Sequence, residues 1–160
     1  MEKRRAIYPG SFDPVTYGHL DLIKRARWIF DEIHVVLAIN PEKQTMFTVE
    51  ERLHFLKRSL GKMSGVKVDA YHGLTVEYAV SKRARTIIRG LRATSDFDYE
   101  FQMALTNRKL SKQVDTVFLM PSENHFYISS RLIKEIASVK GDISNYVPEY
   151  VAAKIHERLF

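Results

Sequence analysis

The segment YPGSFDPVTYGHLDLIKRA at residues 8–26 places a glycine and a histidine together at the start of a helical pattern. Core packing alone does not need a histidine directly after a glycine at the start of a helix, whereas a site that binds an anion there would use both residues. Gly10 and Gly18 allow the backbone to approach a ligand closely, and Ser11 offers a hydroxyl and an amide to a phosphate oxygen. The free N–H groups and the positive dipole end of the helix attract negative charge. The segment therefore predicts a phosphate-binding loop in which His19 donates to an anion, the alternative being a turn with a capping histidine.

The elements that must position this loop alternate between strand and helix patterns. Apolar, β-branched runs predict strands at 5–9, 34–40, 66–72, 86–91 and 115–121. Amphipathic patterns predict helices at 19–30, 49–60, 75–83, 96–110 and 130–139, and a last helix that begins near Pro148. Thr48 and Glu51 form a capping-box signature for the second helix. The alternation favours an α/β fold: a single Rossmann-like domain over residues 1–160, with a five-stranded parallel sheet covered by helices on both faces.

Five loops follow the carboxyl ends of these strands, which is where ligands bind in open parallel sheets. They contain Ser11 to His19, Lys43, Thr75, Arg89 to Arg92, and Pro121 to Arg131. Nearly all the unusual residues of the chain fall in those loops. The coincidence predicts one site, assembled from several loops at a single edge of the sheet.

Composition narrows the class of protein. The chain has 160 residues, enough for one domain with a full core, and no cysteine, which excludes disulfides and thiolate chemistry. A formal net charge of +6 and a sequence pI of about 9.5 favour polyanionic partners, with a merely solvated basic surface as the alternative. The N-terminus is charged at once, and no apolar run is long enough to span a membrane. We therefore expect a cytoplasmic protein with no membrane partner.

Two motifs and the stretch between them resemble a known family. TYGH at 16–19 resembles the (H/T)xGH motif of the nucleotidyltransferase superfamily, and ISSRLIKE at 128–135 resembles its ISSxxxR/K motif. Between them lie PEKQTMFTVEER at 41–52 and, within residues 87–108, RGLR followed by DYE, which is more specific than the first motif. The combination resembles the bacterial phosphopantetheine adenylyltransferases over essentially the whole chain.

The resemblance implies transfer of the adenylyl group of ATP to 4′-phosphopantetheine, with Mg²⁺, giving dephospho-coenzyme A and pyrophosphate. The nucleophile is a phosphate monoester whose second pKa is about 6, so it is mostly ionised at neutral pH and needs no general base. The difficulty is the approach of a dianion to a triphosphate, which cations, hydroxyls and helix N-termini relieve. The resemblance also implies a homohexamer of two trimers and inhibition by coenzyme A. We expect no protein ligand to a metal and no nucleic-acid partner.

Residue roles that the resemblance implies fall on two sides of the reaction. The catalytic residues are His19, Lys43 and Arg92, and His19 stabilises the transition state at the α-phosphate. The residues that bind phosphopantetheine are Ser11, Lys43, Thr75 and Arg89, with Ser11 bridging the two substrates. The residues that bind ATP are Ser11, Phe12, His19, Gly90, Leu91, Arg92, Glu100, His125, Phe126, Tyr127, Ile128, Ser129, Ser130 and Arg131. Relatives often carry Ser or Thr in place of Arg131, so a hydroxyl contact is lost there.

Other interpretations stay open for several of these residues. Arg89 could serve only in an ion pair with Asp96 or Glu100, and the two serines of the second motif could be mere helix caps. The lysine of the second loop could be an ordinary surface residue. Tyr8 and Trp28, like Phe12, are expected in the core or in the wall of the site rather than in the chemistry.

Two rival functions also stay open. One is another enzyme of the superfamily, which transfers AMP to nicotinamide mononucleotide or CMP to a small phosphate, although RGLR and DYE are not expected there. The other is a basic nucleic-acid-binding domain. Such a domain needs its cations on one continuous face with aromatic platforms, whereas here they are distributed over the loops at the sheet edge.

Overall fold

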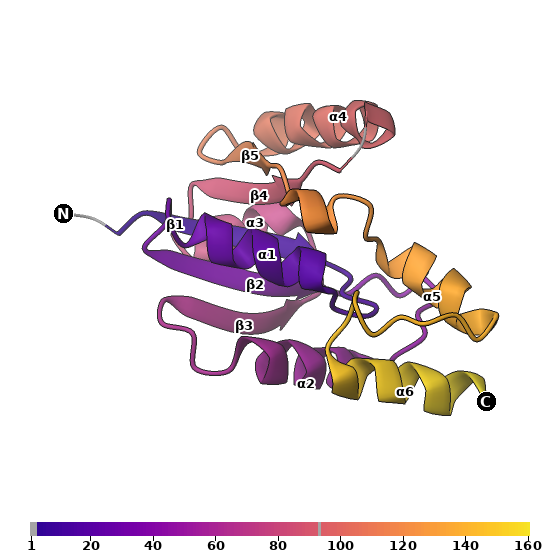
Figure 1. The fold of residues 1–160 in the computed structure, drawn as a ribbon. Coiled ribbons are helices and arrows are strands. Elements are labelled where there is room, and N and C mark those ends of the chain that lie inside the picture. The colour runs from indigo at the N-terminus through magenta and orange to yellow at the C-terminus, as the bar shows by residue number, and fades with distance from the viewer. Residues whose placement is uncertain (1–2, 93) are drawn as a thin grey trace.

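A computed structural model describes residues 3–92 and 94–160 of the chain. Its centre is a sheet of five strands that pair in parallel throughout, in the order β3-β2-β1-β4-β5 (Figure 1). The strands are β1 Arg5–Gly10, β2 Glu32–Ala38, β3 Val66–Tyr71, β4 Thr86–Gly90 and β5 Asp115–Leu119. All five predicted strands are confirmed, and with them the α/β fold class.

In the part of the chain that the structure describes, six α-helices and one short 3-10 helix connect and flank the strands. The α-helices are α1 Tyr17–Ala26, α2 Val49–Leu60, α3 Thr75–Ser81, α4 Thr94–Leu110, α5 Ser130–Ser138 and α6 Glu149–Leu159. The 3-10 helix, η1 Glu123–His125, was not expected from the sequence. The Thr48–Glu51 capping box of α2 is confirmed. Among the described residues, no helix has both the length and the apolar character needed to cross a membrane.

The first helix differs from its prediction at both ends. It begins at Tyr17, two residues early, because Thr16 caps it, and it ends at Ala26 instead of residue 30. Trp28 therefore lies beyond the helix, where it is 78% exposed. The expectation that this side chain belongs to the core or a wall is wrong, whereas Tyr8 and Phe12 are buried as expected.

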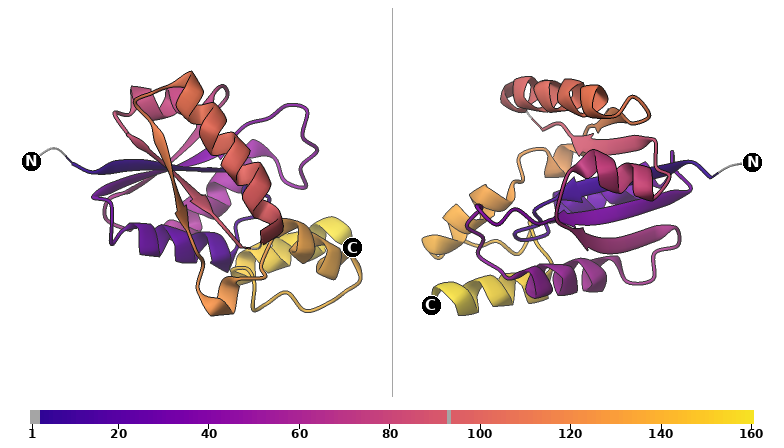
Figure 2. Two further views of the ribbon diagram at one scale, coloured as in Figure 1. Left: turned by 90° about the horizontal axis from the view of Figure 1, so that it is seen from above. Right: turned by 180° about the vertical axis from the view of Figure 1, so that it is seen from behind.

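Helices cover both faces of the sheet because strand side chains alternate between two apolar clusters. Ala6 and Tyr8 of β1 join the larger cluster, to which α1, α2, α5 and α6 contribute. Ile7 joins the smaller cluster, formed with residues of α3. Figure 2 shows α3 on the face opposite to α1, and α4 above β4 and β5. Helix α5 lies beyond the carboxyl ends of the strands (Figure 1).

The central strand separates from one neighbour as it approaches the site. Strand β1 pairs with β2 along its whole length, from Arg5 to Gly10, but pairs with β4 only at Ala6 and Ile7. Pro9 follows in β1, and proline cannot donate a ladder hydrogen bond. Strands β2 and β3 lie on one side of β1, and β4 and β5 lie on the other. The gap between β1 and β4 is therefore a topological switch point, where ligands bind in open α/β sheets.

Candidate active site

The loop after β1 fixes His19 by a capping box at the start of α1. Thr16 is the N-cap, and its side chain accepts a hydrogen bond from the His19 backbone N–H at 3.3 Å. The backbone N–H of Thr16 donates in return to Nδ1 of His19 at 3.0 Å. The histidine thus occupies the position that Glu or Gln takes in other capping boxes. Because Nδ1 accepts, the ring proton lies on Nε2, which is left to donate to a ligand.

The surroundings of His19 keep its ring neutral. Burial, followed by the positive charges of Arg92 and Arg89, lowers the pKa of His19 to about 4. The ring packs against the edge of Phe12, with 5.0 Å between the ring centroids. Phe12 has a φ of 45°, in the left-handed region that side chains other than glycine rarely adopt. The predicted donor is therefore an uncharged imidazole, and Phe12 supports it from within the core.

The loop after β2 brings Lys43 to the same place. The ammonium group of Lys43 donates to the hydroxyl of Ser11 at 2.9 Å. Arg52 of α2 is buried and donates to the carbonyl oxygen of Ser11 at 3.0 Å and to that of Thr48 at 3.2 Å. The start of the first loop is thereby tied to α2, while Lys43 itself remains exposed.

Arg89 lies at the carboxyl end of β4 and bridges β4 and β1 at the point where these two strands no longer pair. Its guanidinium donates to the two carboxylate oxygens of Glu100 at 2.7 and 2.5 Å and to the carbonyl of Pro9 at 3.1 Å. Burial alone would lower the pKa of Arg89. The hydrogen bonds and negative charge of Glu100 outweigh this effect and raise the Arg89 pKa. The ion pair with Glu100 that the sequence left open is present. Three of the five guanidinium N–H groups are used, which leaves two for a ligand.

The next residues of this loop connect β4 to the second motif. Arg92 pairs with Asp96 at 3.2 Å and donates to the carbonyl of Ile128 at 3.3 Å. Gly90 allows close packing of α1, because a Cβ atom there would lie 2.6 Å from Cδ1 of Leu22. A larger residue at Gly90 would push the Leu22 side chain aside, so packing favours this glycine in addition to the ATP contact predicted for it.

The hydroxyl groups of both serines in the second motif make hydrogen bonds within the protein. The Ser129 hydroxyl caps α5 by accepting from the Leu132 N–H at 3.0 Å, and the Ser130 hydroxyl donates to the carbonyl of Pro14 at 2.8 Å. The capping alternative is therefore realised for Ser129, while Ser130 holds α5 against the first loop. The first backbone N–H groups of a helix lack helical partners and stay available to an anion.

The remaining predicted ATP and acceptor residues surround this centre. Arg131 is exposed and pairs along α5 with Glu135 at 2.9 Å. Tyr127 is 82% exposed. Thr75 begins α3 at the same edge of the sheet, on the face opposite to α1. Leu91, His125 and Phe126 are half-buried, and Ile128 is buried.

Three charged residues that the sequence reasoning missed hold these loops together. Asp13 and Arg52 are buried, and Lys134 reaches Asp13 at 2.7 Å. Lys134 is the last residue of the ISSxxxR/K pattern. That pattern was the one feature of the sequence that could have pointed to any of these three residues. The other two sit in ordinary loop and helix patterns, where nothing in the sequence distinguishes them.

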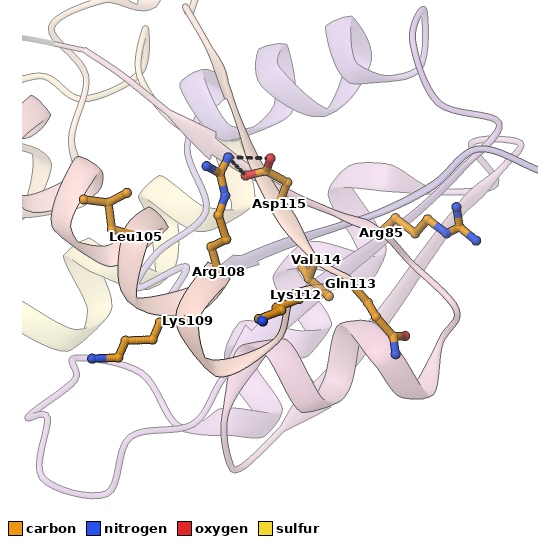
Figure 3. Close-up of a pocket in the computed structure, with 8 residues that line it drawn as sticks. All are labelled: Arg85, Leu105, Arg108, Lys109, Lys112, Gln113, Val114 and Asp115. Atoms are coloured by element: carbon orange, nitrogen blue, oxygen red, sulfur yellow. Dashed lines mark hydrogen bonds and ion pairs between the residues drawn. The ribbon is translucent and has the colours of Figure 1, made fainter.

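Basic residues also gather at the opposite end of the sheet. Open depressions of about 640 and 720 Å³ lie at the amino ends of β4 and β5 and of β2 and β3, respectively. Figure 3 shows the first: Arg108 points to Asp115, whereas Lys109 and Arg85 point away on opposite sides. Within the described part of the chain, no group of three or more His, Asp or Glu side chains could hold a metal ion.

The fold and the site together define the class of protein. The model of the cytidylyltransferase-like family matches residues 7–136, a range that contains both motifs and all of the sheet except the first two residues of β1. The match places the chain among the nucleotidyltransferases. The phosphopantetheine adenylyltransferase of Desulfosudis oleivorans is 52% identical over 154 residues, which cover 96% of this chain and 92% of that protein. The enzyme of the same name from Caldanaerobacter subterraneus subsp. tengcongensis is 51% identical over 155 residues, or 97% of each chain. The chain belongs to the phosphopantetheine adenylyltransferase family, as the motifs predicted.

A solved structure gives an independent view of the fold. A Vibrio parahaemolyticus protein assigned as a nicotinate-nucleotide adenylyltransferase superposes with a TM-score of 0.67 over 96% of this chain and 99% of its own. The two sequences are 20% identical, so this likeness extends to the fold alone.

Proposed function

We propose that the loops at the carboxyl edge of the sheet bind ATP and 4′-phosphopantetheine and join them directly. A phosphate oxygen of phosphopantetheine attacks the α-phosphorus of ATP, and the bond from that phosphorus to the bridging oxygen of the β-phosphate breaks. The products are dephospho-coenzyme A and pyrophosphate. The observation that carries the proposal is the convergence of Ser11, His19, Lys43, Arg89 and Arg92 from three loops at one switch point.

The acceptor phosphate is assigned to Lys43 and Arg89. The two cations come from loops after different strands, and each is held near the end of β1, by Ser11 and by Pro9. A phosphate between them would find the ammonium group and the two unused guanidinium N–H groups. Charge-assisted hydrogen bonds of this kind are the stronger ones. Thr75 would lie along the pantetheine arm.

The nucleotide is assigned to the starts of α1 and α5. The Nε2–H of His19 would donate to an α-phosphate oxygen, where negative charge develops in the transition state. Arg92 would add positive charge, and the backbone N–H groups at Ser129 and Ser130 would meet the β- and γ-phosphates. At Gly18 a Cβ atom would make only ordinary contacts, the nearest at 3.5 Å. Close approach of the nucleotide therefore explains this glycine better than packing does.

Mg²⁺ enters the proposal as part of the nucleotide substrate. Magnesium keeps several waters and binds substrate phosphates, with one or two carboxylates at most. It would neutralise the triphosphate while the residues of the chain orient it. We expect coenzyme A, which shares the pantetheine arm, to compete for the acceptor site. The cytoplasm, where ATP is made and used, is the expected location.

Helix α4 supports the proposed homohexamer of two trimers. Its exposed apolar side chains are 39–63% accessible: Phe97, Tyr99, Phe101, Met103, Leu105 and Leu110. Phe97, Phe101 and Leu105 are spaced four residues apart and so share one face of the helix, and exposed apolar surface marks interaction sites. Light scattering after size-exclusion chromatography measures the mass in solution, and a charge introduced by Phe101→Glu should dissociate the assembly. A wild-type monomer would contradict this part of the proposal.

The activity itself is tested by supplying alternative acceptors. Purified protein, ATP and Mg²⁺ are incubated with phosphopantetheine, nicotinate mononucleotide, nicotinamide mononucleotide or an oligonucleotide, and pyrophosphate release is followed. We expect release only with phosphopantetheine, and stoichiometric dephospho-coenzyme A. Release with a pyridine mononucleotide instead would favour the rival transferase. Thermal stabilisation by oligonucleotides and by none of the small ligands would favour the nucleic-acid-binding alternative.

A further inference from the structure

Asp13 is a buried carboxylate at the meeting point of three segments. Only 4% of this residue is exposed. Its carboxylate accepts hydrogen bonds from the backbone N–H groups of Met46 and Phe47 at 2.9 and 3.0 Å, and from the ammonium group of Lys134 at 2.7 Å. The loop after β1, the loop after β2 and helix α5 are thus joined through one side chain.

The contacts of Asp13 are those that a buried charge needs. Burial alone would raise the pKa of this carboxyl, but the hydrogen bonds from Lys134, Met46 and Phe47 outweigh burial and lower the pKa. Removing one partner of a buried ion pair is strongly destabilising, because the other charge is left without compensation. Lys134, together with the two backbone N–H groups, therefore keeps Asp13 ionised at this position.

Lys134 differs from the other basic residue of the second motif. The Lys134 side chain is 29% exposed and directed to Asp13, whereas that of Arg131 is 88% exposed and pairs only with Glu135 on the same helix. The charge of Lys134 is thus directed toward the first loop. The motif that surrounds the nucleotide side of the site therefore ends in a residue that contacts the acceptor side.

The two hydrogen bonds from Met46 and Phe47 fix the segment that carries Lys43. Lys43 lies three residues before Met46 and donates to Ser11, two residues before Asp13. The loop after β2 is therefore attached to the loop after β1 at two points, one through Asp13 and one through Lys43. A shift of Met46 and Phe47 would move the ammonium group of Lys43 away from Ser11.

We infer that Asp13 and Lys134 are positioning residues for the acceptor, which hold the Lys43 segment where it meets the phosphate of phosphopantetheine. The inference rests on the proposed adenylyl transfer. It assigns the last cation of the ISSxxxR/K motif to the acceptor side, through Asp13, and not to the triphosphate. Displacements of about 1 Å can cost about 10²-fold in rate, so loss of this pair should be visible in kinetics.

The test compares Asp13→Asn, Lys134→Met and Lys134→Arg with the Asp13→Asn/Lys134→Met double variant. The double variant leaves no unpaired buried charge and is the one expected to fold best among the disruptive changes. Lys154→Ala, which breaks an exposed pair with Glu157 on α6, is the matched control. Steady-state kinetics gives KM for each substrate, calorimetry gives the Kd of ATP, and hydrogen exchange reports the amides of residues 43–48.

We expect Asp13→Asn and Lys134→Met to raise the KM for phosphopantetheine roughly tenfold or more, within the cost of a displaced catalytic loop. The Kd of ATP should stay within about twofold, as an indirect effect on the acceptor requires. Exchange at residues 43–48 should rise, the double variant should be no worse than the poorer single variant, and Lys134→Arg should restore most of the loss. A merely structural role would not separate the two substrates.

Two results would overturn the inference. One is a weakened ATP Kd in Lys134→Met with a normal one in Asp13→Asn, which would assign Lys134 to the triphosphate. The other is unchanged exchange at residues 43–48, a measurement that needs no activity. Failure of wild-type protein to adenylylate phosphopantetheine would instead reject the proposed function, and the exchange data would still decide whether the pair positions the loop.

Discussion

The carboxyl end of the sheet and the depression beside β4 and β5 at its amino end both carry basic side chains but hold them differently. At the amino end, Arg108 pairs with Asp115, and the two side chains are 59% and 58% exposed. At the carboxyl end, Arg89 pairs with Glu100, whose side chain is 10% exposed, and Lys134 pairs with Asp13, which is 5% exposed. The amino end also has a largely buried carboxylate, Glu32 of β2, which is 12% exposed and pairs with Arg5 and Lys67. The residues that line the depression beside β4 and β5 include only one carboxylate, the exposed Asp115.

This difference separates a candidate site from a charged surface. Exposed ion pairs contribute little because solvent screens them and because two flexible side chains must be ordered. Buried carboxylates are costly unless they are paired, so their presence beside Arg89 and Lys134 indicates that the positions of these cations matter. The depression in Figure 3 is lined by several basic side chains, but these side chains do not converge on one point.

The largest expected effect is at His19. His19→Ala should lower kcat by roughly 10²-fold or more, as removal of a transition-state hydrogen-bond donor does, with little change in either substrate Kd. Steady-state kinetics and calorimetry on the folded variant measure both quantities. His19→Gln, which can still accept from Thr16, is the matched variant for the capping role. A kcat within about threefold of wild type would place the residue outside the chemistry.

The next effect is on the acceptor cations. Lys43→Ala and Arg89→Ala should raise the KM for phosphopantetheine more than the KM for ATP. Hydrogen bonds to charged groups contribute about 1.5–3 kcal/mol, which corresponds to about 10- to 100-fold. Because Arg89→Ala also leaves Glu100 buried without a partner, Arg89→Ala/Glu100→Gln is the matched control. Unchanged phosphopantetheine binding by calorimetry in both alanine variants would reject the assignment.

The sequence predicted the framework well because its signals are local. Alternation of apolar runs with amphipathic patterns defines the strands, and Thr16 with His19 lies within one helical turn. The contacts of Asp13 are different: its partner Lys134 lies 121 positions away, and Met46 lies 33 away. No local pattern encodes such a pair. The prediction for Trp28 was wrong because a large apolar side chain was expected to be covered, whereas tertiary packing leaves 78% of it exposed. The apolar spacing of Ile29 and Phe30 likewise extended the predicted helix beyond Ala26, where it ends.

The pH dependence distinguishes the first loop further, because His19 does not titrate near neutrality. His19 is protonated only as the pH falls through about 4. Above that pH the acidic limb of kcat/KM for phosphopantetheine should belong to the substrate phosphate, rising near pH 6 and then staying level. The profile is repeated with an analogue whose phosphate has a lower pKa. If the limb does not move with the analogue, a base in the protein has been missed.

The smallest effect is expected at the amino end, and it is the direct test of the comparison. Arg108→Ala removes a charge that faces only Asp115, and Lys109→Ala and Lys112→Ala remove charges from the same depression. If convergence on buried partners defines the site, kcat/KM for both substrates should stay within about twofold of wild type in all three variants, because exposed charges act weakly.

The triple variant, which combines Arg108→Ala, Lys109→Ala and Lys112→Ala, lowers the net charge by three. It therefore also controls for long-range attraction of anionic substrates, which high salt would screen. A loss in the triple variant that disappears with salt would be such attraction. A loss of more than about fivefold in Arg108→Ala that persists at high salt would mean that the amino end acts on the reaction, and the contrast between the two ends would not hold.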